Sequence, residues 1–238
     1  MSQEIADQMA VSLARLLQNG ETVFHGVASP LPMVAVLLAK KLHAPDLVYL
    51  NITGSVDPQP QCLPESTVDP VLLAGTASLF ELQDVFDLAA RGRLDTAFLS
   101  GIQIDRRGCI NMSAVGPYNK PKVRLPGGAG SAFLMETARR VILWRTKHDP
   151  RTFVEQVSFA TACGRVDRVV TPLAVFRLGP QGLQVESIHP YADPAMVRRE
   201  TGFPVDIDES TPVTPSPTGE EIAALAAVDP AKVRLFEF

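Results

Sequence analysis

The sequence predicts an α/β protein with an open, mostly parallel β-sheet covered by helices. Residues 3–18 repeat apolar side chains at helical spacing, and Asn19-Gly20 is a natural helix end. Residues 22–27 and 47–52 are short apolar runs typical of buried strands, and the pattern of 33–42 between them indicates a helix. Because a β-α-β order with buried strands is typical of parallel sheets, these patterns together favour the α/β class.

The remaining elements follow in order along the chain. Residues 53–70 are rich in Pro, Asp and Ser, which indicates a loop. Residues 169–178 and 183–188, joined around 179–182, predict a C-terminal β-hairpin. Residues 211–218 contain three prolines and are expected to form a linker. We expect further helices at 79–90, 131–137, 192–199 and 220–227, and strands at 96–99, 141–144 and 157–162, with another beginning at Ile110.

Composition and charge exclude several classes of protein. The chain has 238 residues, of which 46% are hydrophobic and 20% charged, and we expect one domain over residues 1–238. A net charge of -4 without any basic tract gives no reason to expect nucleic acid as a partner. No stretch is long and apolar enough to span a membrane, and residues 1–20 lack a signal-peptide pattern, so we expect a cytoplasmic protein.

Neither the cysteines nor the histidines form a recognisable metal motif. Cys62, Cys109 and Cys163 are widely spaced, and one would be left over in any disulfide scheme. This favours a reducing compartment and argues against a structural zinc site. The four histidines lack metal-ligand spacing, so each is more simply explained as a structural residue. We therefore expect no metal site.

Residues 126–132, Pro-Gly-Gly-Ala-Gly-Ser-Ala, are the most suggestive local motif. Glycines ahead of a helix let backbone N–H groups point at an anion or at a developing oxyanion. The same residues could equally form a plain tight turn. The motif is not a P-loop, because no Gly-Lys-Ser/Thr ends it, and it lacks the preceding strand of a dinucleotide fingerprint.

Two further segments follow predicted strands, where ligands of α/β proteins tend to bind. The first is 101–108, Gly-Ile-Gln-Ile-Asp-Arg-Arg-Gly, with Asn111 shortly after it. The second is 52–58, Ile-Thr-Gly-Ser-Val-Asp-Pro. Both have simpler explanations, since the first could be a hairpin turn and the second an Asp-Pro turn.

Taken together in order, these motifs resemble the β-type subunit of the class I CoA-transferase family, as in glutaconate CoA-transferase. The resemblance rests on 101–111, on 120–124 leading into 127–130, and on landmarks at 170–176, 189–190 and 201–203. It implies an open α/β fold, a heteromer with a separate α-type subunit (α2β2), and an active site at the subunit interface. It also implies an acyl-CoA substrate, with coenzyme A as part of that substrate and no covalently bound cofactor.

The resemblance includes one departure that bears on chemistry. In the transferases of the family, a β-subunit glutamate in a Glu-Ser-Gly motif attacks the thioester. The matching triplet here is Ile52-Thr53-Gly54, and isoleucine cannot form an acyl anhydride. Two branches also lack this glutamate, namely a decarboxylase of 3-methylglutaconyl-CoA and a ring-opening hydrolase of steroid catabolism. Residues 26–31, 54–58 and 111–112 look more like the decarboxylase branch.

The resemblance implies roles for individual residues. Ile52 marks the position of the lost glutamate and would suit an apolar wall, and an oxyanion loop is expected at Gly128, Ala129 and Gly130. Contacts to substrate or CoA are expected from Ser29, Thr53, Gly54, Gln103, Asn111, Gly127 and Ser131. Three hypotheses remain open. They are a decarboxylase or hydrolase of a dicarboxylic acyl-CoA, a CoA-transferase whose nucleophile comes from the α subunit, and a non-catalytic binding or scaffold subunit.

Overall fold

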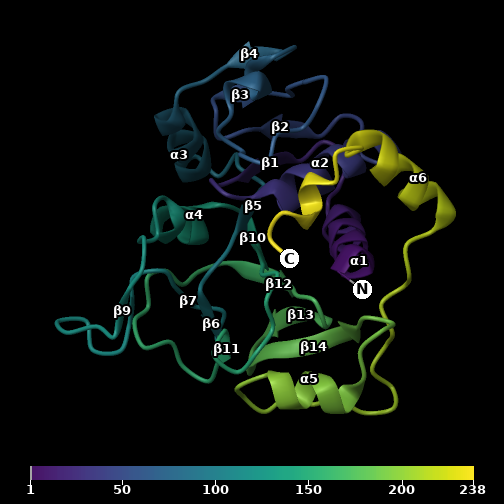
Figure 1. Ribbon diagram of the computed structural model, residues 1–238. Helices are drawn as coiled ribbons and strands as arrows, with labels where there is room; N and C mark the ends of the chain where they lie inside the picture. The colour runs from purple at the N-terminus through teal and green to yellow at the C-terminus, as the bar shows by residue number, and fades with distance from the viewer. Residues whose placement is uncertain (1) are drawn as a thin grey trace. The chain divides into compact units, whose positions relative to one another are not determined.

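The computed structural model describes residues 2–238, which form two compact units (Figure 1). Unit 1 comprises residues 2–98 and 216–238, and unit 2 comprises residues 99–215. The expectation of a single domain over 1–238 stays a prediction. Within residues 2–238, no helix combines the length and the apolar character that a membrane crossing requires.

Unit 1 contains a five-stranded β-region flanked by helices. Its strands lie in the order β5-β1-β2-β3-β4, and β1 pairs in parallel with both β2 and β5. The strands are β1 (Thr22–His25), β2 (Val48–Leu50), β3 (Ser55–Val56), β4 (Ser78–Leu79) and β5 (Thr96–Leu99). The helices are α1 (Ser2–Arg15), α2 (Pro30–Leu42), α3 (Leu82–Ala90) and α6 (Gly219–Val228), with 3-10 turns η1 (Pro70–Leu73) and η2 (Val233–Leu235).

Local sequence explains where the helices of unit 1 begin and how they pack. Helix α2 starts with Pro30 at its first turn, where the missing N–H of proline costs nothing. Helix α6 starts with a capping box between Thr218 and Glu221. The carboxylate of Glu221 also pairs with Arg15 at 2.6 Å, which joins α6 to α1. The C-terminal segment is therefore held against the N-terminal helix by a specific ion pair.

Unit 2 contains a four-stranded β-region and two smaller sheets. In the order β10-β12-β13-β14, β10 and β12 are parallel and the last two strands form an antiparallel hairpin. The smaller sheets are β11-β6-β7 and β8-β9. The strands are β6 (Gln103–Asp105), β7 (Ile110–Asn111), β8 (Ala114–Val115), β9 (Val123–Arg124), β10 (Arg140–Trp144), β11 (Phe153–Val154), β12 (Val166–Val170), β13 (Ala174–Gly179) and β14 (Gly182–Ile188). The helices are α4 (Ser131–Thr137) and α5 (Pro194–Glu200).

The predicted fold class is confirmed, with parallel pairs in both units and a C-terminal hairpin at β13-β14. Two element predictions are wrong. The run 169–178 is not one strand, because the chain leaves β12 at Val170 and re-enters the sheet at Ala174. Residues 157–162 form no strand, because their only ladder contact is the isolated bridge between Ile110 and Ala162. Val157 and Ala162 of this segment are buried from irregular backbone instead.

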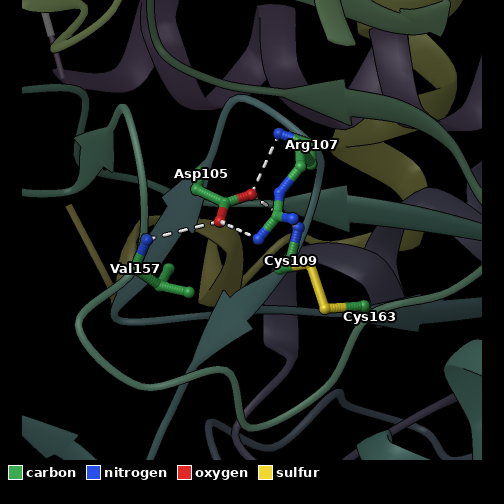
Figure 2. Close-up of a disulfide and its surroundings, with 5 residues drawn as sticks. All are labelled: Asp105, Arg107, Cys109, Val157 and Cys163. Carbon is green, nitrogen blue, oxygen red and sulfur yellow. Dashed lines mark hydrogen bonds and ion pairs between the residues drawn. A yellow bond between two sulfur atoms is a disulfide. The ribbon is translucent and has the colours of Figure 1, made fainter. Parts of the chain in front are cut away.

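Two of the three cysteines pair with each other, and the third is left over. Cys109 and Cys163 form a disulfide with their Cα atoms 4.3 Å apart (Figure 2). Cys62 is free and exposed. An odd cysteine count leaves one thiol over, but it does not stop the other two from pairing. Beside the disulfide, the buried carboxylate of Asp105 accepts hydrogen bonds from the backbone N–H groups of Arg107 and Cys109. The 105–109 turn is thus fixed both covalently and by hydrogen bonds.

Candidate active site

Backbone strain is concentrated in the loops that the sequence singles out. Among residues 2–238, four non-glycine residues have positive φ, and three of them lie in these loops: Ala28 at 49°, Asp57 at 48° and Ala129 at 44°. Such conformations cost on the order of 1–3 kcal/mol each and persist where the surroundings enforce them. They are often found at functional sites, so the strain supports these loops as candidates.

The glycine loop of unit 2 presents free backbone donors. The N–H of Gly127, which has φ 96°, donates to the carbonyl of Met112 at 2.7 Å. The next three N–H groups have no hydrogen-bond partner among residues 2–238; they belong to Gly128, Ala129 and Gly130. Successive N–H groups around a left-handed residue form a concavity that binds anions. The loop therefore has the chemistry of an oxyanion site.

Thr161 packs against this loop, and it is not among the site residues predicted from the sequence. Its Oγ1 accepts from the N–H of Met112 at 2.8 Å and lies 2.7 Å from the hydroxyl of Ser113. A Cβ atom added at Gly128 would lie 2.5 Å from Cγ2 of Thr161, so the two residues are in close contact. Only glycine fits at position 128 while Thr161 occupies this place. No sequence signal identifies a threonine in irregular backbone as a support.

The predicted contact residues around the glycine loop form hydrogen bonds to other residues of the protein. Ser131 donates from its hydroxyl and its N–H to the carbonyl of Gly128. The buried side chain of Asn111 donates to Gln103 Oε1 at 2.8 Å and to the carbonyl of Ala114 at 2.7 Å. Gln103 and Asn111 therefore hold the turn in place. A direct contact to substrate stays a prediction for both.

In unit 1, Ile52 lies in a tight turn between β2 and β3. The N–H of Gly54 donates to the carbonyl of Asn51 at 2.9 Å, and the N–H of Asn51 donates to the carbonyl of Ser55 at 2.9 Å. Gly54 has φ 95°, and a Cβ there would lie 2.6 Å from the carbonyl oxygen of Phe80. The turn therefore requires glycine and presents a half-buried Ile52 side chain. Ser29, another predicted contact in unit 1, is buried and donates to the carbonyl of Val27.

A buried chain of hydrogen bonds runs behind this turn. The Nδ1–H of His25 donates to the carbonyl of Gly26, so Nε2 accepts from the hydroxyl of Tyr49. Asn51 Nδ2 donates to that same hydroxyl oxygen at 2.7 Å, and Asn51 Oδ1 accepts from the Thr53 hydroxyl at 2.7 Å. Burial lowers the pKa of His25 to about 4 and raises the pKa of Tyr49, which keeps both groups neutral. No sequence motif marks this network, because its members are separated along the chain.

The carboxylates beside the turn are engaged in structural contacts. Asp57 pairs with Lys40 Nζ at 2.8 Å and accepts from the N–H of Tyr49 at 3.0 Å. Glu81 forms the capping box of α3 with Asp84. Each of these groups already has a structural partner that a covalent intermediate would displace.

The remaining histidines make contacts within the protein. His43 contacts the carbonyl of Leu17, and His189 donates to the carbonyl of Thr171. His148 lies between the hydroxyls of Thr171 and Thr201, and burial lowers its pKa to about 3. Among residues 2–238 there is no cluster of three His, Cys, Asp or Glu side chains that could hold a metal ion.

Comparison with known proteins decides the family. The family model described as coenzyme A transferase matches residues 6–197. The chain belongs to the coenzyme A transferase family. It is 31% identical to the B subunit of 3-oxoadipate CoA-transferase from Pseudomonas knackmussii, over 94% of this chain and 92% of that protein. It is 25% identical to the B subunit of glutaconate CoA-transferase from Acidaminococcus fermentans, over 96% of this chain and 89% of that protein.

Solved structures of other proteins share this fold. The decarboxylase AibA/AibB matches with a TM-score of 0.93 and 36% identity, covering 98% of both chains. IpdAB of Rhodococcus jostii RHA1 matches with a TM-score of 0.84 at 24% identity, over 98% of this chain and 97% of that chain, which supports the fold alone.

Proposed function

We propose that this chain and an α-type partner subunit form an acyl-CoA enzyme whose reaction needs no nucleophile from this chain. Decarboxylation of a dicarboxylic acyl-CoA is the favoured reaction, and hydrolysis is the next. The observation that carries the proposal is Ile52, an apolar side chain in the turn where the family resemblance places the glutamate nucleophile. Asp57, the nearest carboxylate along the chain, is committed to Lys40.

The chemistry fits an oxyanion site combined with an apolar surface. When a vinylogous acyl-CoA loses its carboxylate, the C–C bond breaks and CO₂ leaves. The electron pair moves through the double bond to the thioester carbonyl, which becomes a dienolate oxygen, and solvent then supplies the proton. The free N–H groups at 128–130 would bind that oxygen. Each such donor is typically worth about 2.7–4 kcal/mol in the barrier.

The comparisons support this choice. The match to the decarboxylase AibA/AibB is 36% identical, whereas the match to the structure of glutaconate CoA-transferase is 23% identical. AibA/AibB is named as a pair, and several relatives are named as B subunits, which supports an α-type partner. We propose an α2β2 assembly in the cytoplasm, with coenzyme A entering as part of the substrate.

The test is turnover by the complex, obtained by co-expression with a gene for an α-type subunit. We expect CO₂ release from 3-methylglutaconyl-CoA or glutaconyl-CoA without any added carboxylate acceptor. CoA transfer to acetate, with no CO₂ and no free CoA, would refute the proposal. Release of free CoA alone would indicate hydrolysis.

A transferase with a nucleophile on the α subunit is the second candidate. The 31% identity to one component of a 3-oxoadipate CoA-transferase favours it. In that case, hydroxylamine or borohydride would trap a glutamyl thioester on the partner during turnover. A scaffold subunit is the third candidate, and a complex whose activity is unchanged by a bulky residue at Ala129 would support it.

A further inference from the structure

The hairpin β8-β9 in unit 2 carries an exposed basic segment that the proposed chemistry does not use. Lys120, Lys122 and Arg124 lie within five residues of each other on this hairpin, and all three are exposed. Neither lysine has an ion-pair partner in the described part of the chain. In Figure 1 the hairpin, labelled at β9, projects from the rest of its unit. Unpaired cations on a projecting hairpin are available to an anionic ligand.

This hairpin is a direct extension of the glycine loop. In the first hydrogen bond of its ladder, the N–H of Gly127 donates to the carbonyl of Met112 at 2.7 Å. In the next, the N–H of Leu125 donates to the carbonyl of Ser113 at 3.0 Å. In the last, the N–H of Lys122 donates to the carbonyl of Val115 at 2.9 Å. The basic tip and the free N–H groups therefore belong to one continuous hydrogen-bonded element.

Aromatic contacts hold the tip in place. Tyr118 stacks on Phe159 with ring centroids 4.7 Å apart, and the guanidinium of Arg124 lies 4.8 Å from the centre of the Tyr118 ring. Arg124 also donates to the carbonyl of Tyr118 at 3.1 Å. Phe159 precedes Thr161 by two positions, so one segment supports both the tip and the glycine loop. Arg124 is thus committed to the hairpin, and the two lysines are the cations left for a ligand.

The distance along the hairpin matches the length of a CoA arm. Lys122 lies roughly five residues before Gly127, and a strand advances about 3.3 Å per residue, so the two are about 16 Å apart. The pantetheine arm has about 13 covalent bonds between the sulfur and the first phosphorus, and it spans roughly 15 Å when extended. A thioester carbonyl at the glycine loop would therefore place the phosphates of CoA near the lysines.

We propose that the β8-β9 hairpin is a CoA-binding arm, in which Lys120 and Lys122 bind the phosphate groups of the nucleotide. This rests on the proposed function, because it assumes that the glycine loop holds the thioester. Lysine is a common phosphate ligand, and a projecting pair would bind the phosphates while leaving the rest of the nucleotide in solvent. The ligand class is therefore the 3′-phosphate and diphosphate of coenzyme A.

The test measures the Kd of coenzyme A by titration calorimetry on the complex with the α-type subunit. The variant Lys120→Ala/Lys122→Ala should weaken CoA binding by roughly tenfold, the scale of one charge-assisted contact. Its Kd should also depend less on salt, because fewer charged contacts remain. Pantetheine lacks the phosphates, so its Kd, measured by competition with CoA, should not change. The matched control is Arg177→Ala/Arg199→Ala, which removes the same charge from exposed positions on β13 and α5.

Three results would overturn the proposal. They are an unchanged Kd for CoA in the lysine variant, equal weakening of CoA and pantetheine, and loss of assembly with the α-type subunit. The last result would make the hairpin a subunit contact. Failure of the wild-type complex to bind CoA at all would instead refute the proposed function, so the two failures are distinguishable.

Discussion

Replacing Gly128 with alanine tests how the glycine loop is supported. The new Cβ would lie 2.5 Å from Cγ2 of Thr161 and 3.0 Å from Oγ of Ser131. The first distance is about 1 Å shorter than an ordinary carbon–carbon contact, so the loop and Thr161 must move apart. Overpacking of this kind costs about 1–3 kcal/mol of stability.

The larger effect of Gly128→Ala should be on catalysis. A shift of about 1 Å moves N–H donors away from the developing oxyanion, and losing one donor typically lowers kcat by about 10²–10³-fold. We therefore expect kcat of the complex to fall by roughly 10²-fold while KM changes little. Steady-state kinetics on the acyl-CoA substrate measures both values, and thermal unfolding measures the stability loss.

A second substitution makes the test of Gly128 specific. Thr161→Ser removes Cγ2 but keeps the hydroxyl that accepts from Met112, so it should restore most of the activity lost in Gly128→Ala. Gly127→Ala is the matched control. Its Cβ would meet no atom within 4 Å, so any loss of activity would come from backbone strain at φ 96°. Thr161→Ser should therefore not restore the activity of Gly127→Ala. Wild-type kcat in Gly128→Ala, or no rescue by Thr161→Ser, would refute the reasoning.

Three other outcomes follow from the buried polar groups and the disulfide. Tyr49→Phe removes a hydroxyl that bonds both a histidine and an asparagine, so the free energy of unfolding should fall by about 1–3 kcal/mol; denaturant titration measures this, and no change would contradict the network. The free energy of unfolding should also fall as pH drops from about 6.5 toward 4, by up to about 1.4 kcal/mol per pH unit for each buried histidine. The reason is that burial disfavours the histidine cation in the folded state, so the unfolded chain takes up the proton first. Urea titrations across this range should show the loss, and a flat profile would contradict the lowered pKa values of His25, His148 and His189. Cys109→Ser should lower the free energy of unfolding by about 4 kcal/mol, the value that the chain-entropy treatment gives for a sequence separation of 54. Cys62→Ser should have no effect on thermal unfolding. Equal melting temperatures of the two variants would show that the disulfide does not form.

Much of the fold can be predicted because local patterns dominate its elements. The apolar periodicity at 3–18 and the short apolar runs at β1 and β5 correspond to buried faces in the structure. The error at 157–162 has a physical cause, because Thr161 and Ala162 bond to Ile110 from irregular backbone. An apolar run alone does not distinguish such a segment from a strand.

The candidate site is predictable only in part, for a similar reason. Glycines at 127, 128 and 130 show that the chain needs an unusual loop, and the loop does present three free N–H groups. The role of Thr161 and the hydrogen-bond network that links His25 to Thr53 could not be predicted from the sequence. Both depend on contacts between residues that are separated along the chain. The pairing of Cys109 with Cys163 is hidden in the same way.

The most direct test of the central claim is the intact mass of this chain during turnover. The complex is incubated with acyl-CoA, quenched, and analysed with and without hydroxylamine treatment. Because Ile52 cannot carry an acyl group, the mass of this chain should remain unchanged while CO₂ is released. A CoA thioester or a hydroxamate on any carboxylate of this chain would contradict the account.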